Sequence, residues 1–405
     1  MRRSKSLLTL GLTLACAAVP FSLAVRAPAQ TFTVLHTFGG GLVDGEYPGG
    51  GLVEDPTGNI FGATQEGGAA NAGTIFKIDS KGHESLLYSF TGGADGYFPT
   101  STLLLNTNGE MYGVTGFGGD LNCGYSGCGV VFAVDSVGAL RVLHTFHFQD
   151  GDGPCAFFVC GALVEDPDGN LYGTTDGGGN AMFYGTAFSV SSAGEEQTLY
   201  NFCTQADCVD GYGSGNLTRD AAGNLYGVAF EGGVYGLGLL FKIDSSGAYS
   251  VLHNFGEGTD GASPWGAPYI DAVGNLYGTT FYGGDLSCES GRGCGIVYKV
   301  GANGVETTLH QFHGGTDGGF PYGGLTRDGQ GNFYGTTSGG TVTGDYGTVF
   351  RLDLKGRETV LHHFKAATDG VYPQAGLLLD ARGNLYGTTS GLDAFNYGTV
   401  FKIAP

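Results

Sequence analysis

A four-residue sequence, Asn-Leu-Tyr-Gly with conservative variants, occurs seven times in the chain at intervals of 51 to 60 residues. The copies begin at Asn59, Glu110, Asn170, Asn224, Asn275, Asn332 and Asn384. A fixed period of this length is typical of a repeat architecture, in which each small unit buries its apolar faces only against its neighbours. We therefore expect seven similar units rather than several unrelated domains.

Each unit reads as four short strands, which we name A to D. In the third unit they fall at residues 161–166, 170–175, 185–190 and 196–202. Each run is rich in Val, Leu, Tyr, Phe and Thr and is bounded by Gly or Asp, which indicates strands. The A–B junction is Asp-x-x-Gly-Asn in six of the seven copies, and Asp-x-x-Gly recurs at C–D. These are hairpin turns, so consecutive strands are predicted to be antiparallel neighbours.

Strand C is apolar on both faces, as in Thr399 to Ile403, which suits a small sheet sandwiched between two copies of itself. We predict an all-β fold, a seven-bladed β-propeller of four-stranded antiparallel blades over residues 30–405. The chain opens with a lone D strand at 31–38 and closes with strand C at 398–403. Pairing of these two segments would complete the last blade and remove two exposed edges. An open superhelical solenoid is the alternative, and it requires separated termini.

The first 29 residues resemble a secretory signal. Arg2, Arg3 and Lys5 precede an apolar stretch, and Ala27-Pro28-Ala29 offers a small-residue cleavage site before Gln30. A twin-arginine signal, a lipobox at Cys16 and a retained membrane anchor are weaker alternatives. No later stretch approaches the length of a membrane span. We expect an exported, monomeric protein that is periplasmic, secreted or associated with the cell surface, with no transmembrane segment in the mature chain.

The formal net charge is −20, and the leader carries only basic residues, so the mature chain is more acidic still. Such a charge disfavours nucleic acid and anionic membranes as partners. Glycine contributes 79 of 405 residues without a Gly-X-Y period, which is typical of many tight turns between short strands.

Eight cysteines follow Cys16, and they fall into four local pairs. The pairs are Cys123/Cys128, Cys155/Cys160, Cys203/Cys208 and Cys288/Cys294. An even number in close pairs predicts disulfides in an oxidising compartment. Zinc is the alternative, but four or five residues separate the cysteines and no histidine is placed to complete a tetrahedral site. We therefore predict disulfides, no metal and no cofactor.

Antiparallel order places the A–B and C–D turns on one rim of the ring and the B–C and D–A loops on the other. We call these the turn rim and the loop rim. The loop rim carries every cysteine pair and the long inserts, with 13 residues between Thr115 and Gly129 and 14 between Thr280 and Gly295. The disulfides are expected to brace these inserted loops.

Two further residue types recur with the repeat. The D–A connections contain Asp-Gly at Asp44, Asp95, Asp152, Asp210, Asp260, Asp317 and Asp369. One Asp per blade cannot build one calcium coordination sphere, so these pairs are interpreted as turns. Strand D carries histidine in five units, with Tyr88 and Tyr200 in the other two; the histidines are His36, His144, His253, His310 and His362. No carboxylate partner can be assigned to them from the sequence, so we predict no catalytic residue.

A few loop-rim residues break the repeat and are the candidate binding residues. They are Trp265, which is the single tryptophan, Arg292 and Glu289 on the Cys288 loop, and Phe157 and Phe158 on the Cys155 loop. Exposed aromatics can stack on a sugar or anchor a protein. Packing beneath the long loops is the competing interpretation.

The repeat consensus is long and specific. It contains Leu-His-x-Phe, Asp-Gly-x-x-Pro, Gly-Leu-x-x-Asp-x-x-Gly-Asn-Leu-Tyr-Gly-Thr-Thr and Gly-Thr-Val-Phe-Lys-Ile-Asp. These motifs resemble the GloVer repeat, and residues 31 to 404 are similar to the choice-of-anchor tandem-repeat GloVer-containing proteins. The resemblance implies a bacterial, exported, surface-associated protein and supplies no established activity. Unlike members with a C-terminal sorting segment, this sequence stops at Ala404-Pro405, so release is expected rather than anchoring.

Three functions are compatible with these features. The first is a binding or scaffold module whose disulfide-braced loop rim holds an extracellular carbohydrate or protein. The second is a propeller-type extracellular hydrolase or lyase, which requires non-repeating His, Glu or Arg residues at the channel mouth, because fold similarity alone cannot support an activity. The third is a structural cell-surface protein that associates with itself.

Overall fold

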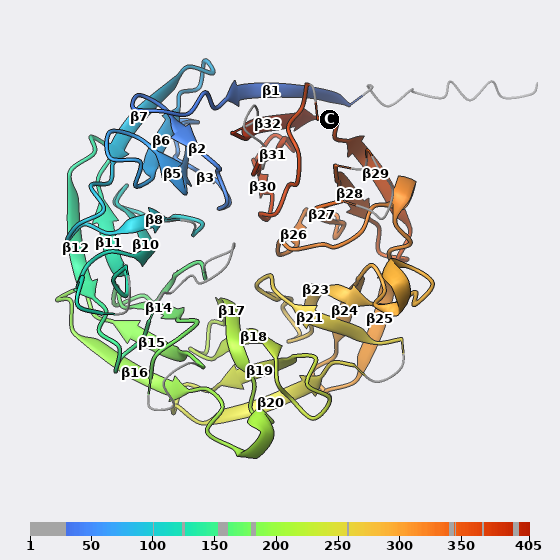
Figure 1. The fold of residues 1–405 in the computed structure, drawn as a ribbon. Helices are drawn as coiled ribbons and strands as arrows, with labels where there is room; N and C mark the ends of the chain where they lie inside the picture. The colour runs from blue at the N-terminus through green and yellow to red at the C-terminus, as the bar shows by residue number, and fades with distance from the viewer. Residues whose placement is uncertain are drawn as a thin grey trace, which may run out of the picture.

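The computed structural model describes residues 30–99, 101–123, 126–152, 161–179, 184–256, 259–339, 344, 346–366, 368–391 and 397–405. Seven antiparallel sheets stand around a central axis as the blades of a propeller (Figure 1). The predicted all-β, seven-bladed fold is confirmed. Among the helices of the described ranges, none is long and apolar enough to cross a membrane.

The blades follow the order of the chain, and each has four strands from the channel outward. Blade 1 consists of β3 (Val53–Glu54), β4 (Ile60–Thr64), β6 (Thr74–Ile78) and β7 (Glu84–Ser89). Blade 2 consists of β9 (Leu104–Leu105), β10 (Met111–Phe117), β11 (Val130–Val134) and β12 (Leu140–Thr145). Blade 3 consists of β13 (Val164–Glu165), β14 (Leu171–Thr174), β15 (Thr186–Val190) and β16 (Glu196–Asn201). Blades 4 and 5 are β17 (Tyr212–Arg219), β18 (Leu225–Glu231), β19 (Leu239–Ile243) and β20 (Tyr249–Asn254); and β22 (Tyr269–Ile270), β23 (Leu276–Gly283), β24 (Ile296–Val300) and β25 (Glu306–Gln311).

Blades 6 and 7 complete the ring. They are β26 (Thr326–Arg327), β27 (Phe333–Thr337), β28 (Thr348–Leu352) and β29 (Glu358–His363); and β30 (Leu378–Leu379), β31 (Leu385–Thr389), β32 (Thr399–Ala404) and β1 (Thr31–Thr37). The loops add short elements: β2 (Gly45–Glu46) paired with β5 (Glu66–Gly67), β8 (Tyr97–Pro99), β21 (Gly261–Pro264), and the 3-10 turns η1 (Ala206–Cys208), η2 (Glu289–Gly291) and η3 (Gly315–Asp317).

The ring is closed by its two ends. Strand β1 pairs antiparallel with β32, from Thr31 opposite Ala404 to Thr37 opposite Thr399. Figure 1 shows β1 lying along the outer edge of the last blade. The predicted pairing of the first and last strands is therefore confirmed, and the open solenoid is excluded.

The core lies between the blades, where strand C presents one large aromatic ring per blade. Six blades carry a fully buried phenylalanine there, and blade 5 carries Tyr298. The glycine of the Asn-Leu-Tyr-Gly sequence lies directly beneath this ring, since a Cβ on Gly62 would come within 2.5 Å of Phe76 Cζ. The repeated glycine is thus required by packing, and a side chain at that position would displace the ring.

The A–B turn follows the mechanism expected from its sequence. Asp380 Oδ1 accepts hydrogen bonds from the backbone N–H groups of Arg382 and Asn384, and Oδ2 accepts from Asn384 Nδ2 and the Tyr386 hydroxyl. Burial acts to raise the pKa of Asp380, but the hydrogen bonds from Asn384 outweigh it and lower that pKa. One carboxylate therefore fixes the whole turn, with Gly383 at a positive φ of 84°.

Candidate functional site

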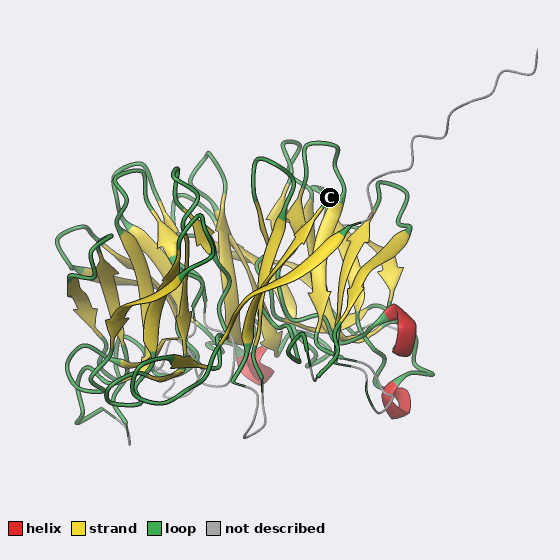
Figure 2. Ribbon diagram, turned by 90° about the horizontal axis from the view of Figure 1, so that it is seen from above, coloured by secondary structure: helices red, strands yellow, loops and turns green. Residues whose placement is uncertain are grey.

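The two rims differ as the sequence predicts. In Figure 2 the 3-10 turns lie on one side of the ring, together with long loops, whereas the chain end after β32 lies on the opposite side. Turns η1 and η3 belong to D–A connections and η2 belongs to a B–C loop. The described loops that carry the Cys203/Cys208 and Cys288/Cys294 pairs therefore share one surface.

Disulfides join Cys123 to Cys128, Cys203 to Cys208 and Cys288 to Cys294. Three of the four predicted bridges are confirmed, and they are consistent with an exported protein. Cys155, Cys160, Phe157 and Phe158 lie outside the described residues.

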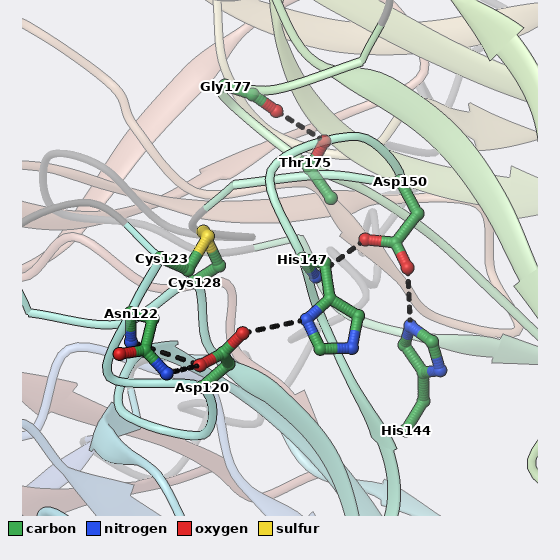
Figure 3. The surroundings of a disulfide bond; sticks show 9 residues. All are labelled: Asp120, Asn122, Cys123, Cys128, His144, His147, Asp150, Thr175 and Gly177. Atoms are coloured by element: carbon green, nitrogen blue, oxygen red, sulfur yellow. Dashed lines mark hydrogen bonds and ion pairs between the residues drawn. A yellow bond between two sulfur atoms is a disulfide. The ribbon is translucent and has the colours of Figure 1, made fainter.

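The Cys123–Cys128 loop is also tied to the D–A connection of its own blade. His147 Nδ1 lies 3.0 Å from Asp120 Oδ2, and Asp120 Oδ1 accepts a hydrogen bond from the Asn122 backbone N–H (Figure 3). The disulfide and this ion pair hold the same loop from two sides. The inserted loops of the rim are thus braced, as expected.

Five aromatic rings form a continuous row on the loop rim across blades 4, 5 and 6, which we call the aromatic ladder. Phe230 stacks on Trp265 with ring centroids 4.3 Å apart and planes within 8°. Trp265 contacts Tyr322 at 5.5 Å, Tyr322 contacts Phe281 at 4.5 Å, and Phe281 contacts Phe320 at 5.1 Å. All five side chains are partly exposed. The ladder therefore presents aromatic surface to solvent.

Four of the five ladder rings stand at positions without a repeat consensus, whereas Phe320 stands where Tyr47, Phe98 and Tyr372 also precede the proline of the D–A connection. Phe230 and Phe281 stand directly after the position of the second Thr in the Asn-Leu-Tyr-Gly-Thr-Thr stretch of strand B. The other five units have Gln65, Gly116, Asp176, Ser338 and Ser390 at the same position. Trp265 and Tyr322 follow the proline of the D–A connection, where Gly49 and Gln374 stand in blades 1 and 7. Since the sevenfold frame does not need Phe230, Trp265, Phe281 and Tyr322, the clustering of these four rings on one side of the rim is a feature of this site.

The ladder adjoins the central channel. Trp265 and Tyr322 directly precede Gly266 and Gly323, at the start of the innermost segments of blades 5 and 6. These segments help to line a cavity of about 250 Å³ to which all seven blades contribute. The described lining combines apolar Leu52, Pro268, Leu325 and Leu377 with glycines, alanines, threonines, Asn216 and Gln374, and its single ionisable side chain is Tyr269. The described lining thus offers no carboxylate, imidazole or cation.

A chain of ring contacts connects two of the predicted binding residues, Trp265 and Arg292, and the third, Glu289, lies beside Arg292. The Arg292 guanidinium lies 5.6 Å from the centre of the Tyr282 ring, which contacts Phe281 at 4.6 Å. Arg292 is therefore connected to the ladder through Tyr282 and Phe281. Glu289 is exposed on η2, and its backbone carbonyl accepts a hydrogen bond from the Arg292 N–H.

The strand-D histidines have partners that the sequence analysis did not assign. His253 Nε2 and His362 Nε2 each lie 3.0 Å from an aspartate oxygen of the following Asp-Gly pair, and the other three histidines lie 3.2 to 3.4 Å away. In blade 2 the partner of His144 is Asp150, which begins the Asp-Gly-x-x-Pro stretch from Asp150 to Pro154, and not Asp152. Asp152 instead pairs through its backbone with Gly177. Tyr88 and Tyr200 replace the histidine and donate their hydroxyls to Asp95 and Asp210.

Comparisons with known proteins agree with this architecture. The Gloeobacter/Verrucomicrobia repeat matches residues 19–215 and 212–405. No curated protein matches the chain.

Solved structures with a similar fold include virginiamycin B lyase from Staphylococcus aureus, with a TM-score of 0.59 and 13% identity over 93% of this chain and 99% of that one. A streptogramin B lyase has a TM-score of 0.59 and 11% identity over 92% and 97% of the two chains. The extracellular domain of a proposed hybrid two-component system from B. thetaiotaomicron has a TM-score of 0.55 and 9% identity over 90% of this chain and 39% of that one. At these identities the likeness shows the fold alone.

Proposed function

The chain belongs to the Gloeobacter/Verrucomicrobia repeat family, and from this premise and the geometry of its loop rim we propose that it is an exported binding module. Its ligand is an uncharged molecule with a flat apolar face, such as a sugar ring of an extracellular glycan. The binding surface is the aromatic ladder at the channel mouth over blades 4 to 6.

The observation that supports this proposal most directly is the ladder itself. Aromatic rings are large apolar surfaces that lose little conformational entropy on binding, and they dominate the energy of many binding sites. Tyr322 adds a hydroxyl whose pKa is raised, first by burial and then by the neighbouring Tyr282. That hydroxyl stays protonated and can donate a hydrogen bond to a ligand.

The charge distribution supports an uncharged ligand. The whole chain carries a formal charge of −20, yet the described lining of the adjoining cavity holds no acidic or basic side chain. A charged ligand in this cavity would lose hydration without gaining a partner. The lining offers instead the neutral polar groups that hydroxyl-rich ligands use.

The likeness to two lyases does not favour catalysis here. General acid–base chemistry needs a titratable side chain within hydrogen-bond reach of the reacting group. The described cavity lining supplies Tyr269 and no carboxylate or imidazole, so binding is the better supported function.

The test uses Trp265, the single tryptophan of the chain, as its own reporter. The purified chain is screened on an array of neutral and charged glycans, and hits are titrated by tryptophan fluorescence and calorimetry. We expect neutral glycans to bind and to change the emission of Trp265.

A matched pair of variants locates the site. Trp265→Ala should weaken binding at least tenfold, since loss of a central aromatic contact costs about 2 kcal/mol or more. Leu286→Ser, at a side chain that is 48% exposed on the Cys288 loop, should bind as the parent does. Blank arrays, or unchanged affinity of Trp265→Ala, would contradict the proposal.

A further inference from the structure

Four of the seven junctions between blades hold clusters of three ligating side chains. In each of these, a strand-D histidine and its aspartate lie near a glutamate that is the first residue of strand D in the next blade. The four glutamates are Glu84, Glu196, Glu306 and Glu358. His36, Asp44 and Glu84 meet between blades 7 and 1, and His310, Asp317 and Glu358 meet between blades 5 and 6.

We propose that these two clusters each bind a divalent transition-metal ion of the zinc class. In both, the three ligand atoms lie within 4.8 Å of one another. One imidazole nitrogen and two carboxylate oxygens form a donor set suited to Zn²⁺, with a fourth position left for water. The aspartates come from the Asp-Gly pairs, which have too few donors alone but gain two more from neighbouring strands.

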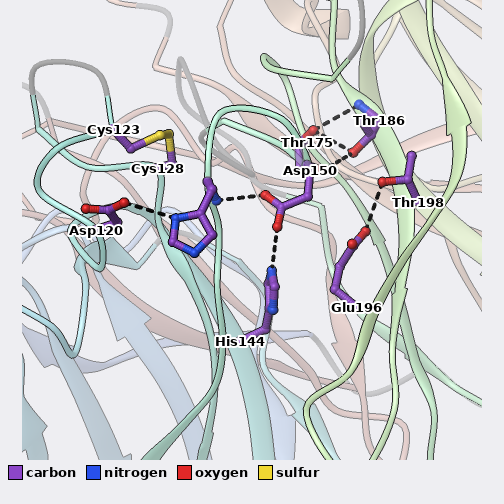
Figure 4. A network of polar contacts seen from close by, with 10 residues as sticks. Asp120, Cys123, Cys128, His144, Asp150, Thr175, Thr186, Glu196 and Thr198 are labelled. Atoms are coloured by element: carbon purple, nitrogen blue, oxygen red, sulfur yellow. Dashed lines mark hydrogen bonds and ion pairs between the residues drawn. A yellow bond between two sulfur atoms is a disulfide. The ribbon is translucent and has the colours of Figure 1, made fainter.

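The two remaining His-Asp-Glu clusters differ, because their polar atoms are already satisfied. His144 Nε2 lies 3.2 Å from Asp150 Oδ2, and the Glu196 carboxylate accepts a hydrogen bond from the Thr198 hydroxyl (Figure 4). His253 pairs with Asp260 at 3.0 Å, and Glu306 accepts from its own strand neighbour Thr308. We call these the closed junctions.

The proposed metal junctions instead contain buried atoms without hydrogen bonds. Within the described part of the chain, Glu358 Oε1 is buried and lacks a hydrogen-bond partner, and the buried His36 Nε2 and His310 Nε2 each have only a long contact of 3.4 Å to an aspartate oxygen. An unpaired buried polar atom is costly, so such atoms call for a ligand. Three of the five atoms of this kind in the described chain belong to these two clusters.

The distances agree with metal coordination. In both clusters the histidine Nε2 lies 3.4 Å from the nearest aspartate oxygen. Two donors each about 2.0–2.1 Å from a tetrahedral ion lie about 3.4 Å from one another, which is longer than the 3.0 to 3.2 Å of the closed junctions. A rotation of the glutamate side chain would bring the third donor to the same ion.

Charge also favours a cation. Each cluster joins two carboxylates in a half-buried space, and like charges so placed repel unless a proton or a metal ion intervenes. A metal ion between blades 7 and 1 would link β1, the strand that closes the ring, to its neighbour. The expected consequence is a ring that is more stable to opening.

The experiment measures metal content and stability on tag-free chain. Protein stripped with a chelator is dialysed against Zn²⁺, washed, and assayed by elemental analysis and thermal unfolding. We expect two ions per chain and a Tm that rises with Zn²⁺ concentration. Replacement by Co²⁺ should give the visible absorption of a low-symmetry four-coordinate site.

The closed junctions provide the controls. Glu84→Gln and Glu358→Gln should each reduce the content to one ion and together to none, whereas Glu196→Gln and Glu306→Gln should leave two. Circular dichroism checks that every variant is folded. If the parent retains no Zn²⁺, or if the double variant retains two ions, the clusters are neutralised by protons and the proposal is wrong.

Discussion

Tyr298 offers a sharp test of how the blades pack. Six blades place phenylalanine at this position, and blade 5 places a tyrosine that is fully buried with a hydroxyl lacking any hydrogen-bond partner in the described chain. The neighbouring strand-A position is also unusual, because Pro268 stands where the first blade has Leu52. A Cβ on Gly62 would meet both Leu52 and Phe76, whereas the three atoms nearest to one on Gly278 all belong to Tyr298, the hydroxyl oxygen first at 2.4 Å. The hydroxyl therefore occupies space that a leucine fills elsewhere.

Removing this hydroxyl should stabilise the protein. An unsatisfied buried hydroxyl destabilises the folded state by about 1–3 kcal/mol. Tyr298→Phe removes this cost, but the small gap that it leaves destabilises the variant by about 0.5–1 kcal/mol through lost contacts. The net gain is about 1 kcal/mol, which for a chain of this size raises Tm by about 1–2 °C. Guanidinium unfolding followed by circular dichroism measures it through the midpoint. A midpoint lowered by the equivalent of about 1 kcal/mol would refute the reasoning and show that the hydroxyl has a partner such as a buried water.

The companion variant tests the compensation itself. Pro268→Leu alone should overpack against Tyr298 and cost about 1–3 kcal/mol. In the Tyr298→Phe background the same change restores the pattern of the first blade, and the cost should largely disappear. A coupling energy of about 1–3 kcal/mol in the double-mutant cycle is expected. Equal costs in both backgrounds would show that the two residues vary independently.

Three other outcomes follow from the packing and the charges. Gly227→Ala should destabilise by about 1–3 kcal/mol, because its Cβ would lie 2.5 Å from the strand-C ring, whereas Gly329→Ala, which meets nothing within 4 Å, should change the unfolding midpoint little. Phe32→Ala should cost about 2 kcal/mol, because it removes the stack of Phe32 on His362 between blades 7 and 6, with ring centroids 3.6 Å apart. Thermal unfolding measures this loss. Burial and, after it, the charge of Asp260 raise the pKa of Glu306 above its usual value of 4.5. The folded chain therefore binds a proton at Glu306 more readily than the unfolded chain, and the free energy of unfolding falls as pH rises through the raised pKa. Glu306→Gln should flatten this decline, and an unchanged dependence of stability on pH would contradict the prediction.

The sequence predicted the ring because its strongest signals are contacts that must be made seven times. The Asp-x-x-Gly-Asn turn and the glycine beneath the strand-C ring are local, and each needs a particular residue type. The closure by residues 31–38 followed from counting strands, since an unpaired strand at each end leaves exposed edges.

The aromatic ladder could not be predicted in full, since four of its five rings stand at non-consensus positions of different units. Trp265 stood out as the single tryptophan, but Phe230 and Tyr322 become its neighbours only when blades 4 to 6 are placed side by side. The backbone adds a second difficulty. Phe320 has a φ of +58° although it precedes a proline, a position that normally favours extended backbone. Its N–H thereby reaches the Cys294 carbonyl of the preceding blade, a contact that local propensity does not indicate.

Strand β1 shows why the junctions matter more than the individual blades. It pairs with β32 through its backbone, stacks Phe32 on His362 of blade 6, and places His36 beside Glu84 of blade 1. At another junction Tyr200 and Tyr249 stack at 3.9 Å, so a ring replaces the carboxylate as the partner from the next blade. The same position is thus filled by stacking, by hydrogen bonds or, as we propose, by a metal ion. Because each blade buries its faces only against neighbours, and β1 makes contacts in both directions, the stability of the whole ring depends on this one strand.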